Sequence, residues 1–187
     1  MAATFLVENT NASDAPLIET LLDISFGIDR RLKTSYRLRE GNTAVGDLSL
    51  VVRDDKVGIA GSISFWPVAI GKLGTAGLLL GPLVVNPERQ NLGVGLALME
   101  EGLRRAKMAG HKLVILVGDV PYYARVGFQK LPEGQLLMPG PVNPERFLYL
   151  ELAEGALANT EGLVLPPHRF QEISAAFAGP HETHGQQ

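Results

Sequence analysis

A short segment between Gln90 and Gly95, with the sequence QNLGVG, has the composition and position of a phosphate-binding loop. It separates an apolar run that ends at Pro87 from an amphipathic run that begins at Gly93. The first turn of a helix leaves backbone N–H groups unpaired, and the helix dipole adds partial positive charge there. Because residues 93 and 95 carry no side chain, a phosphate can approach this backbone closely. The segment therefore predicts a site for a phosphorylated ligand.

Two common phosphate-binding motifs do not match this segment. A dinucleotide-binding loop requires Gly-x-Gly-x-x-Gly, but Leu98 occupies the third glycine position. A Walker A loop requires Gly-x-x-x-x-Gly-Lys-Ser/Thr, and here Gly71 and Lys72 are followed by Leu73. The segment fits Gln/Arg-x-x-Gly-x-Gly/Ala instead.

The elements that must position this loop follow from hydrophobic periodicity and turn residues. The spacing predicts a helix from Gly93 to Ala109, because its apolar residues recur at intervals of three and four. Strands over 48–53, 57–68 and 76–85 precede it, and the short polar turns between them make neighbouring strands antiparallel. A buried strand over 112–117 follows the helix. Such a crossover predicts that the strands before and after the helix are parallel.

Shorter elements complete the prediction. Ser13 or Asp14 is expected to cap an early helix that continues through Leu22. Further strands are predicted over 5–7, from Phe128, and over 146–152, which we expect to be the last. A small helix over 173–177 is expected to pack, and the final residues are expected to be disordered.

A further helix is predicted over residues 29–38, and its face is basic. Such a face is either a solvated helix surface or a contact for an acidic ligand or partner. The basic residues are Arg30, Arg31, Lys33, Arg37 and Arg39.

The composition narrows the classes of function. The 187 residues are 45% hydrophobic and 20% charged, with a net charge of −3, which does not favour non-specific nucleic-acid binding. The absence of cysteine excludes disulfides, a thiolate nucleophile and Cys-ligated zinc. No signal sequence and no membrane-spanning run is recognisable, so a cytoplasmic protein without a membrane partner is expected. His181 and His184 lack a third ligand, so no metal is expected.

With these features the chain resembles the GNAT superfamily of acetyl-CoA-dependent N-acetyltransferases. The resemblance rests on the QNLGVG segment, on the preceding Val-Asn-Pro-Glu at 85–88, and on the tyrosines shortly before Gly-Phe in YYARVGF at 122–128. The pieces LGPL at 80–83 and GDVPYY at 118–123 are similar to one widespread bacterial branch of predicted acetyltransferases. The order of elements matches from about residue 2 to 152, and the specific motifs span Leu80 to Phe128.

The resemblance implies a mixed α/β fold with a central, mostly antiparallel sheet and helices on both faces. The strands ending at Val85 and Val117 would splay apart. Acetyl-CoA would bind as co-substrate, with its pyrophosphate on the N–H groups from Asn91 to Leu96 and its pantetheine arm in the gap, paired with the main chain like an added strand. A backbone N–H of the strand ending at Val85 would stabilise the developing oxyanion. The implied cofactor-binding residues are Leu83, Val84, Val85, Gln90, Asn91, Leu92, Gly93, Val94, Gly95 and Leu96.

The same resemblance suggests catalytic groups. Tyr123 occupies the position where the family keeps its general acid, and a phenol with a pKa of about 10 carries its proton at neutral pH. The alternative is that Tyr123 only packs under the cofactor. Asp119 is a candidate general base, acting directly or through water, and the alternative is that it caps a short helix over 121–125. The family more often has a longer helix and an asparagine before the tyrosine.

The sequence thus predicts transfer of an acetyl group to a primary amine by direct attack, on a small molecule or a protein. The alternatives are a non-catalytic acyl-CoA sensor or scaffold with the same fold and, more weakly, a nucleotide-binding protein. An acetyltransferase domain over residues 1–155 and a C-terminal extension over 156–187 are expected, and a homodimer is left open. Four aromatic residues either line the acceptor pocket or belong to the core: Phe26, Tyr36, Trp66 and Tyr122.

Overall fold

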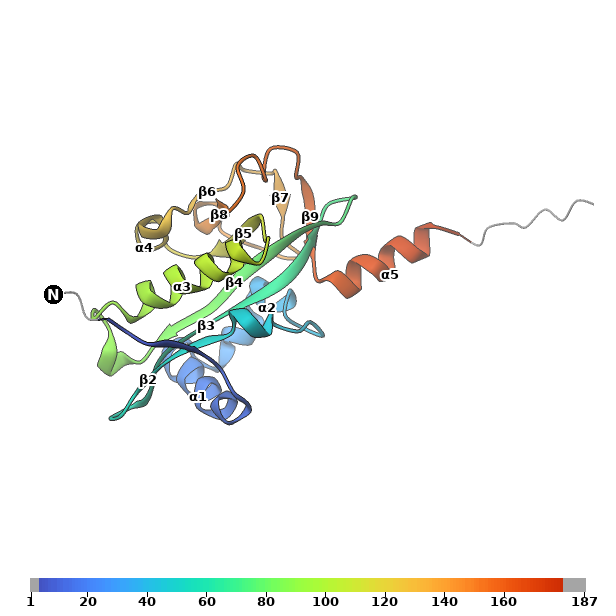
Figure 1. Cartoon of the computed structure of the whole chain (residues 1–187). Coiled ribbons are helices and arrows are strands. Elements are labelled where there is room, and N and C mark those ends of the chain that lie inside the picture. The colour runs from blue at the N-terminus through green and yellow to red at the C-terminus, as the bar shows by residue number, and fades with distance from the viewer. Residues whose placement is uncertain (1–3, 180–187) are drawn as a thin grey trace, which may run out of the picture.

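A nine-stranded mixed sheet forms the centre of the structure, a computed structural model that describes residues 4–179 (Figure 1). The main strand order is β1-β2-β3-β4-β5-β8-β6, and β9 pairs with both β3 and β7. The strands are β1 (Val7–Asn9), β2 (Leu50–Asp54), β3 (Gly58–Ile70), β4 (Thr75–Val85), β5 (Leu113–Val117), β6 (Gln129–Lys130), β7 (Leu136–Leu137), β8 (Phe147–Glu151) and β9 (Gly162–Leu165).

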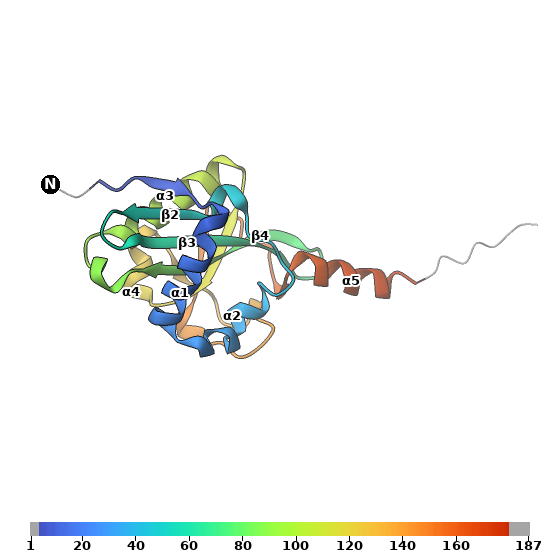
Figure 2. The same cartoon turned by 90° about the horizontal axis from the view of Figure 1, so that it is seen from below.

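Helices cover both faces of this sheet. The longest, α3, packs on one face, and α1 packs on the other, as two views of the ribbon show (Figures 1 and 2). This arrangement confirms the predicted layers. The helices are α1 (Ala15–Phe26), α2 (Thr34–Arg37), α3 (Val94–Met108), α4 (Val120–Tyr123) and α5 (Pro167–Phe177).

The alternation of side chains along each strand explains the two layers. In β2, Leu50 and Val52 belong to the hydrophobic cluster beneath α3, whereas Val51 packs with Leu21 and Leu22 of α1. A strand directs successive side chains to opposite faces, so a continuous apolar run is buried on both sides. The pairings β2–β3 and β3–β4 are antiparallel and β4–β5 is parallel, as the turn and crossover patterns predict.

The prediction of a single helix over residues 29–38 is wrong. The segment forms a 3₁₀ helix at Ile28–Leu32 and then α2, because Lys33 between them is extended, with ψ 143°. The buried Arg30 is held back against Glu19 and Asp23 of α1. These tertiary contacts outweigh the local preference for a continuous helix. The first strand likewise begins at Val7, where pairing with Val52 of β2 starts.

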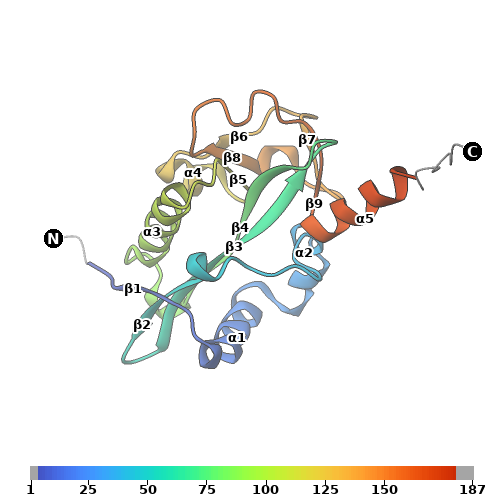
Figure 3. The ribbon, with the colours of Figure 1, turned by 45° about the vertical axis from the view of Figure 1, so that its right-hand side comes forward.

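The expectation that the strand over 146–152 is the last is also wrong. β9 adds to the far end of β3, with the pairs Ala69↔Leu165 and Ile70↔Val164. The helix predicted at the C-terminus starts earlier than expected, as α5, and buries none of its residues. Figure 3 shows α5 extending away from the sheet. The domain division after residue 155 stays a prediction, and the expected disorder of the final residues falls on 180–187, outside the described residues.

A buried carboxylate joins the start of α1 to β2. The Asp14 side chain is 2% exposed. It accepts hydrogen bonds at 2.6 and 2.8 Å from the guanidinium of Arg53 and at 2.7 Å from the backbone N–H of Asn11. The Arg53 guanidinium is the main cause that holds the pKa of Asp14 below its usual value. The ion pair therefore stabilises the fold while Asp14 is ionised.

We expect Asp14→Asn to lower the free energy of unfolding by about 1–3 kcal/mol at pH 7. This loss is smaller than that expected on breaking a fully buried ion pair, because Arg53 is 37% exposed. A depressed folded-state pKa contributes stability above the unfolded-state pKa of about 3.9, and that contribution is lost as pH falls further. Urea denaturation should show the difference between the two proteins narrowing below about pH 4. The exposed Asp55→Asn is the control, and an equal loss in both variants would contradict the expectation.

Candidate active site

The amino-terminal end of α3 forms a cradle of backbone N–H groups. Gly93 occupies the N-cap position with a left-handed φ of 93°, a conformation without steric penalty for glycine. No side chain of the described residues caps this end, so the first-turn N–H groups, from Val94 to Leu96, remain available to another acceptor. The helix dipole adds partial positive charge at the same point. This geometry suits a phosphate group.

Gly95 in this first turn has no space for a side chain. A Cβ atom on Gly95 would lie 2.0 Å from Oη of Tyr122 and 3.3 Å from Cγ2 of Val85. Tyr122 of α4 therefore reaches across to α3, while Val85 closes the approach from the end of β4. The QNLGVG loop thus lies next to the two other segments that carry the sequence motifs, the end of β4 and α4.

The parallel strands β4 and β5 pair over only two residues each. Their register contains Leu78↔Val114 and Leu79↔Ile115, yet β4 continues to Val85 and β5 to Val117. The strands therefore diverge, as predicted, and the edge of β4 that faces β5 is unpaired beyond Leu79. A cavity of about 750 Å³ lies along this gap and reaches the α3 cradle, a size typical of ligand pockets.

A bulge interrupts β4 where the gap opens. In the pairing with β3, Phe65 lies opposite Leu80 but Ile63 lies opposite Leu83, so β4 has one extra residue between them. The carbonyl oxygen of Gly81 in this bulge accepts hydrogen bonds from Nε1 of Trp66 at 2.8 Å and from Oγ of Ser64 at 3.0 Å. Trp66 thus holds the bulge in place through the Gly81 carbonyl and is not among the residues that line the cavity.

The phenol of Tyr123 is packed into the inner part of the cavity wall. Its ring meets those of Tyr122 and Phe128 edge-on, with centroids 5.1 and 6.0 Å apart. A Cβ atom on Gly118 would lie 2.2 Å from this ring, so the glycine at the end of β5 makes room for Tyr123. Burial is the main cause that raises the pKa of Tyr123 to about 12. The phenol therefore keeps its proton throughout the working range of pH.

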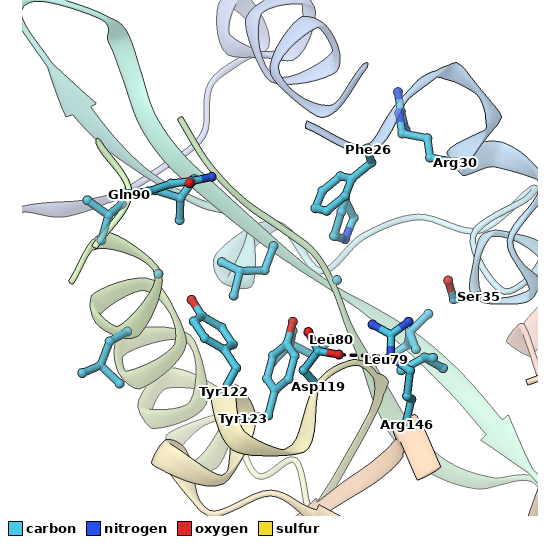
Figure 4. A pocket seen from close by; sticks show the side chains of 18 of the residues that line it. Phe26, Arg30, Ser35, Leu79, Leu80, Gln90, Asp119, Tyr122, Tyr123 and Arg146 are labelled. Carbon is cyan, nitrogen blue, oxygen red and sulfur yellow. Dashed lines mark ion pairs between the residues drawn. The ribbon is translucent and has the colours of Figure 1, made fainter. Parts of the chain in front are cut away.

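Asp119 lies beside Tyr123 at the start of α4 (Figure 4). Asp119 occupies the N-cap position of α4, as the alternative reading expected, but its side chain makes no hydrogen bond to the helix. Its carboxylate instead lies 3.3 Å from Nε of Arg146 and is 76% exposed. The carboxylate is therefore open to solvent and to a ligand in the cavity.

The structure brings most of the predicted site residues to this cavity. Phe26 and Tyr36 come from the wall opposite Tyr122 and Tyr123, as Figure 4 shows for Phe26. Three predicted residues lie elsewhere, and one of them is Trp66, which contacts the β4 bulge. The side chain of Val84 is buried beneath α1, and Leu92 is 54% exposed outside the cavity. The predicted residues that line the cavity are Phe26, Tyr36, Leu83, Val85, Gln90, Asn91, Gly93, Val94, Gly95, Leu96, Asp119, Tyr122 and Tyr123.

Several basic residues that line the cavity were not predicted as site residues. Cations outnumber acids in the lining, where Asp119 is the single carboxylate among the described residues. This imbalance favours an anionic ligand. The basic pattern over 29–39 was a usable signal, whereas Arg125 and Arg146 stood in no distinctive pattern. The lining cations are Arg30, Lys33, Arg39, Arg89, Arg125 and Arg146.

The described part of the chain has neither a metal-binding cluster nor a membrane-spanning helix. Within residues 4–179, no three side chains of His, Asp or Glu gather as a metal site requires. His181 and His184 lie outside the described residues. No helix in the same part of the chain is long and apolar enough to cross a membrane.

Comparison with known proteins places these features in a family. The family model described as acetyltransferase (GNAT) family matches residues 16–128. The uncharacterized N-acetyltransferase YhbS of Escherichia coli (strain K12) is 32% identical over 81% of this chain and 89% of its own length. A second relative from the same strain, the uncharacterized N-acetyltransferase YjhQ, is 31% identical over 67% of this chain and 70% of its own.

Solved structures show the same fold. The crystal structure of YhbS from Escherichia coli in complex with CoA superposes with a TM-score of 0.74 at 29% identity, covering 91% of this chain and 95% of that one. A GNAT family acetyltransferase from Brucella melitensis in complex with acetyl-CoA superposes with a TM-score of 0.56 at 27% identity, covering 82% and 97%. The predicted mixed α/β fold of this type is therefore confirmed.

Proposed function

The chain belongs to the GNAT family of acetyltransferases, and we propose that it transfers an acetyl group from acetyl-CoA to a primary amine by direct attack. The observation that carries this proposal is the single cavity that joins the α3 cradle, the β4–β5 gap and the phenol of Tyr123. The complexes of similar proteins with CoA and acetyl-CoA support the choice of co-substrate.

The residues present fit acetyl-CoA from the α3 cradle to the β4 bulge. The N–H groups of the α3 cradle, with Gln90 and Asn91 at its entry, would hold the pyrophosphate. The free edge of β4 at Leu83 and Val85 would pair with the amide groups of the pantetheine arm. Pro82 has no N–H, so a backbone donor for the carbonyl oxygen must come from a neighbouring residue of the bulge. Acetyl-CoA supplies the activated acetyl group as a thioester.

The reaction requires two proton movements. The amine nitrogen forms a bond to the acetyl carbon, the carbon–sulfur bond breaks, and its electron pair leaves with the sulfur. Tyr123 would donate its proton to that sulfur, since burial keeps the phenol protonated. The amine must lose a proton, and Asp119 would accept it directly or through water. No covalent acyl-enzyme is needed in this scheme.

We expect Asp119→Asn to lower kcat/KM at pH 7 by about 10- to 100-fold. The loss should shrink as pH approaches the pKa of the acceptor amine, because a neutral amine no longer needs the base. Release of free thiol measured across pH checks both points. Glu145→Gln, which removes an exposed carboxylate paired with Lys130 outside the cavity, is the control. A loss of the same size at every pH would contradict a role as base.

The function itself is tested by calorimetric titration followed by turnover. Titration with acetyl-CoA and, in parallel, ATP should show binding of acetyl-CoA alone, and preference for ATP would refute the proposal. A panel of primary amines should then give acceptor-dependent thiol release. Tight binding of acetyl-CoA without turnover on any amine would favour the sensor or scaffold. The nature of the acceptor as small molecule or protein, a homodimer, and a cytoplasmic location stay predictions.

A further inference from the structure

One cation in the cavity wall has a buried N–H group without a hydrogen-bond acceptor. Arg39 follows α2, and its Nε is buried without a hydrogen-bond acceptor in the described part of the chain. Its guanidinium lies over the ring of Tyr36, 4.9 Å from the centroid. No ion pair joins Arg39 to a carboxylate of residues 4–179. Such a group is costly to bury, and each exception in a folded protein calls for a physical explanation.

Arg30, nearby on the same segment, shows how this fold neutralises a buried cation. Arg30 is only 6% exposed and is paired with both Glu19 and Asp23. Glu19 is also within 3.5 Å of Arg31, so its charge is already shared. Burial is the main cause that lowers the pKa of Arg39 to about 10, and the charge of Arg30 acts in the same direction. Arg39 is therefore still charged at pH 7, and although the charge of Glu19 acts on it from a distance, no carboxylate of the described chain forms an ion pair with it.

The position of Arg39 separates it from the proposed phosphate site. Arg39 lines the main cavity and also a smaller one of about 430 Å³ that includes Pro82 and Trp66, so it lies near the β4 bulge. The α3 cradle and Gln90 lie at the other end of the main cavity. Figure 4 shows Gln90 and Ser35, the latter from the α2 wall, on opposite sides of this space. An anion at Arg39 would thus belong to the acceptor.

We propose that the acceptor is an amine that carries a carboxylate, and that Arg39 binds this carboxylate at the α2 wall of the cavity. The planar guanidinium presents paired N–H donors that match the two oxygens of a carboxylate. The inference rests on the proposed acetyl transfer, since it names the acceptor class of that same site. It also disfavours polyamines, because their additional positive charges would face Lys33 and Arg39.

The test compares acceptors that differ only at the far end from the amine. Linear ω-amino acids from 5-aminopentanoate upward and their primary amides have similar amine pKa values and nearly the same shape. With acetyl-CoA saturating, kcat/KM for thiol release should favour the carboxylate of the best length by about 10- to 100-fold, the range for a hydrogen bond to a charged group. Equal rates, or preference for the amide or for a polyamine, would overturn the proposal.

Substitutions test whether Arg39 causes the preference for a carboxylate-bearing acceptor. Arg39→Met should bring the carboxylate-to-amide ratio to about one while leaving the affinity for CoA unchanged, and Arg39→Lys should keep part of the ratio. Arg31→Met is the control, because it removes an equal charge from the same segment outside the cavity. A weaker affinity for CoA in Arg39→Met with an unchanged ratio would show that Arg39 serves the co-substrate and refute the proposal. If Arg39→Met does not fold, the proposal is decided by the carboxylate-to-amide ratio of the wild-type protein and of Arg39→Lys.

A binding experiment distinguishes failure of this inference from failure of the proposed function. The complex with CoA is titrated with 5-aminopentanoate and with its amide by calorimetry. Binding of the acid alone, lost in Arg39→Met, would support the carboxylate site even if no amine were acetylated. Acetylation of simple amines without any carboxylate preference would leave the proposed function standing and overturn the inference.

Discussion

Tyr123→Phe is expected to reduce kcat by about 10²- to 10³-fold, with an unchanged affinity for acetyl-CoA, because a general acid commonly contributes a factor of this order. The substitution removes only the hydroxyl, so the edge-on packing of the ring against Tyr122 and Phe128 is retained. Single-turnover thiol release, with calorimetry on the same samples, measures the two quantities separately.

The pH dependence gives this experiment a second readout. Since burial raises the pKa of Tyr123 to about 12, the wild-type enzyme should not lose its acid between pH 9 and 10.5, where an unperturbed phenol with a pKa of about 10 would ionise. Tyr149→Phe, on β8 outside the cavity, is the matched control. If Tyr122→Phe were the variant that lost turnover, the assignment of the acid to Tyr123 would be wrong.

Gly95→Ala is expected to weaken binding of CoA by about 10- to 100-fold, comparable to the loss of a hydrogen bond to a charged group. The new Cβ would occupy the approach to the first turn of α3 and would also meet Oη of Tyr122 at 2.0 Å. Titration calorimetry measures the affinity, and the thermal midpoint of unfolding reports whether the fold is intact.

Two further variants separate these causes. In a Tyr122→Phe background the clash with Oη is absent, so a persistent loss of CoA affinity would show that Cβ itself obstructs the phosphate. Gly102→Ala is the control on the same helix, because its Cβ would lie 2.6 Å from the ring of Phe65 in the core. It should lower stability and leave CoA affinity unchanged. Equal effects of Gly95→Ala and Gly102→Ala on CoA binding would argue against a phosphate site at α3.

Local signals explain what the sequence could predict. The α3 loop is marked by two glycines and by the helical period that follows them, and both depend on neighbouring residues alone. The crossover from β4 through α3 to β5 follows from chirality and element length. The side chain of Val84 could have been excluded from the site by strand geometry alone, because adjacent residues of a strand point to opposite faces of the sheet.

The features that were not predicted depend on contacts between distant segments. The helix over 29–38 is broken because carboxylates of α1 hold Arg30. β9 exists as a strand because it meets Ala69 and Ile70, far away in sequence. Asp119 has the residue type and position of a helix cap, yet its side chain lies near Arg146 instead. The importance of Arg39 depends on which carboxylates are missing around it, and that is a property of the folded chain.

The two-residue pairing of β4 with β5 has a thermodynamic consequence. Because the strands already diverge after Leu79 in the folded chain without a ligand, the free energy of separating them is part of folding and is not paid on ligand binding. An extended arm that enters the gap satisfies main-chain groups without displacing any β4–β5 hydrogen bond. The site is in this sense preorganised, so that more of the interaction free energy is expressed as affinity.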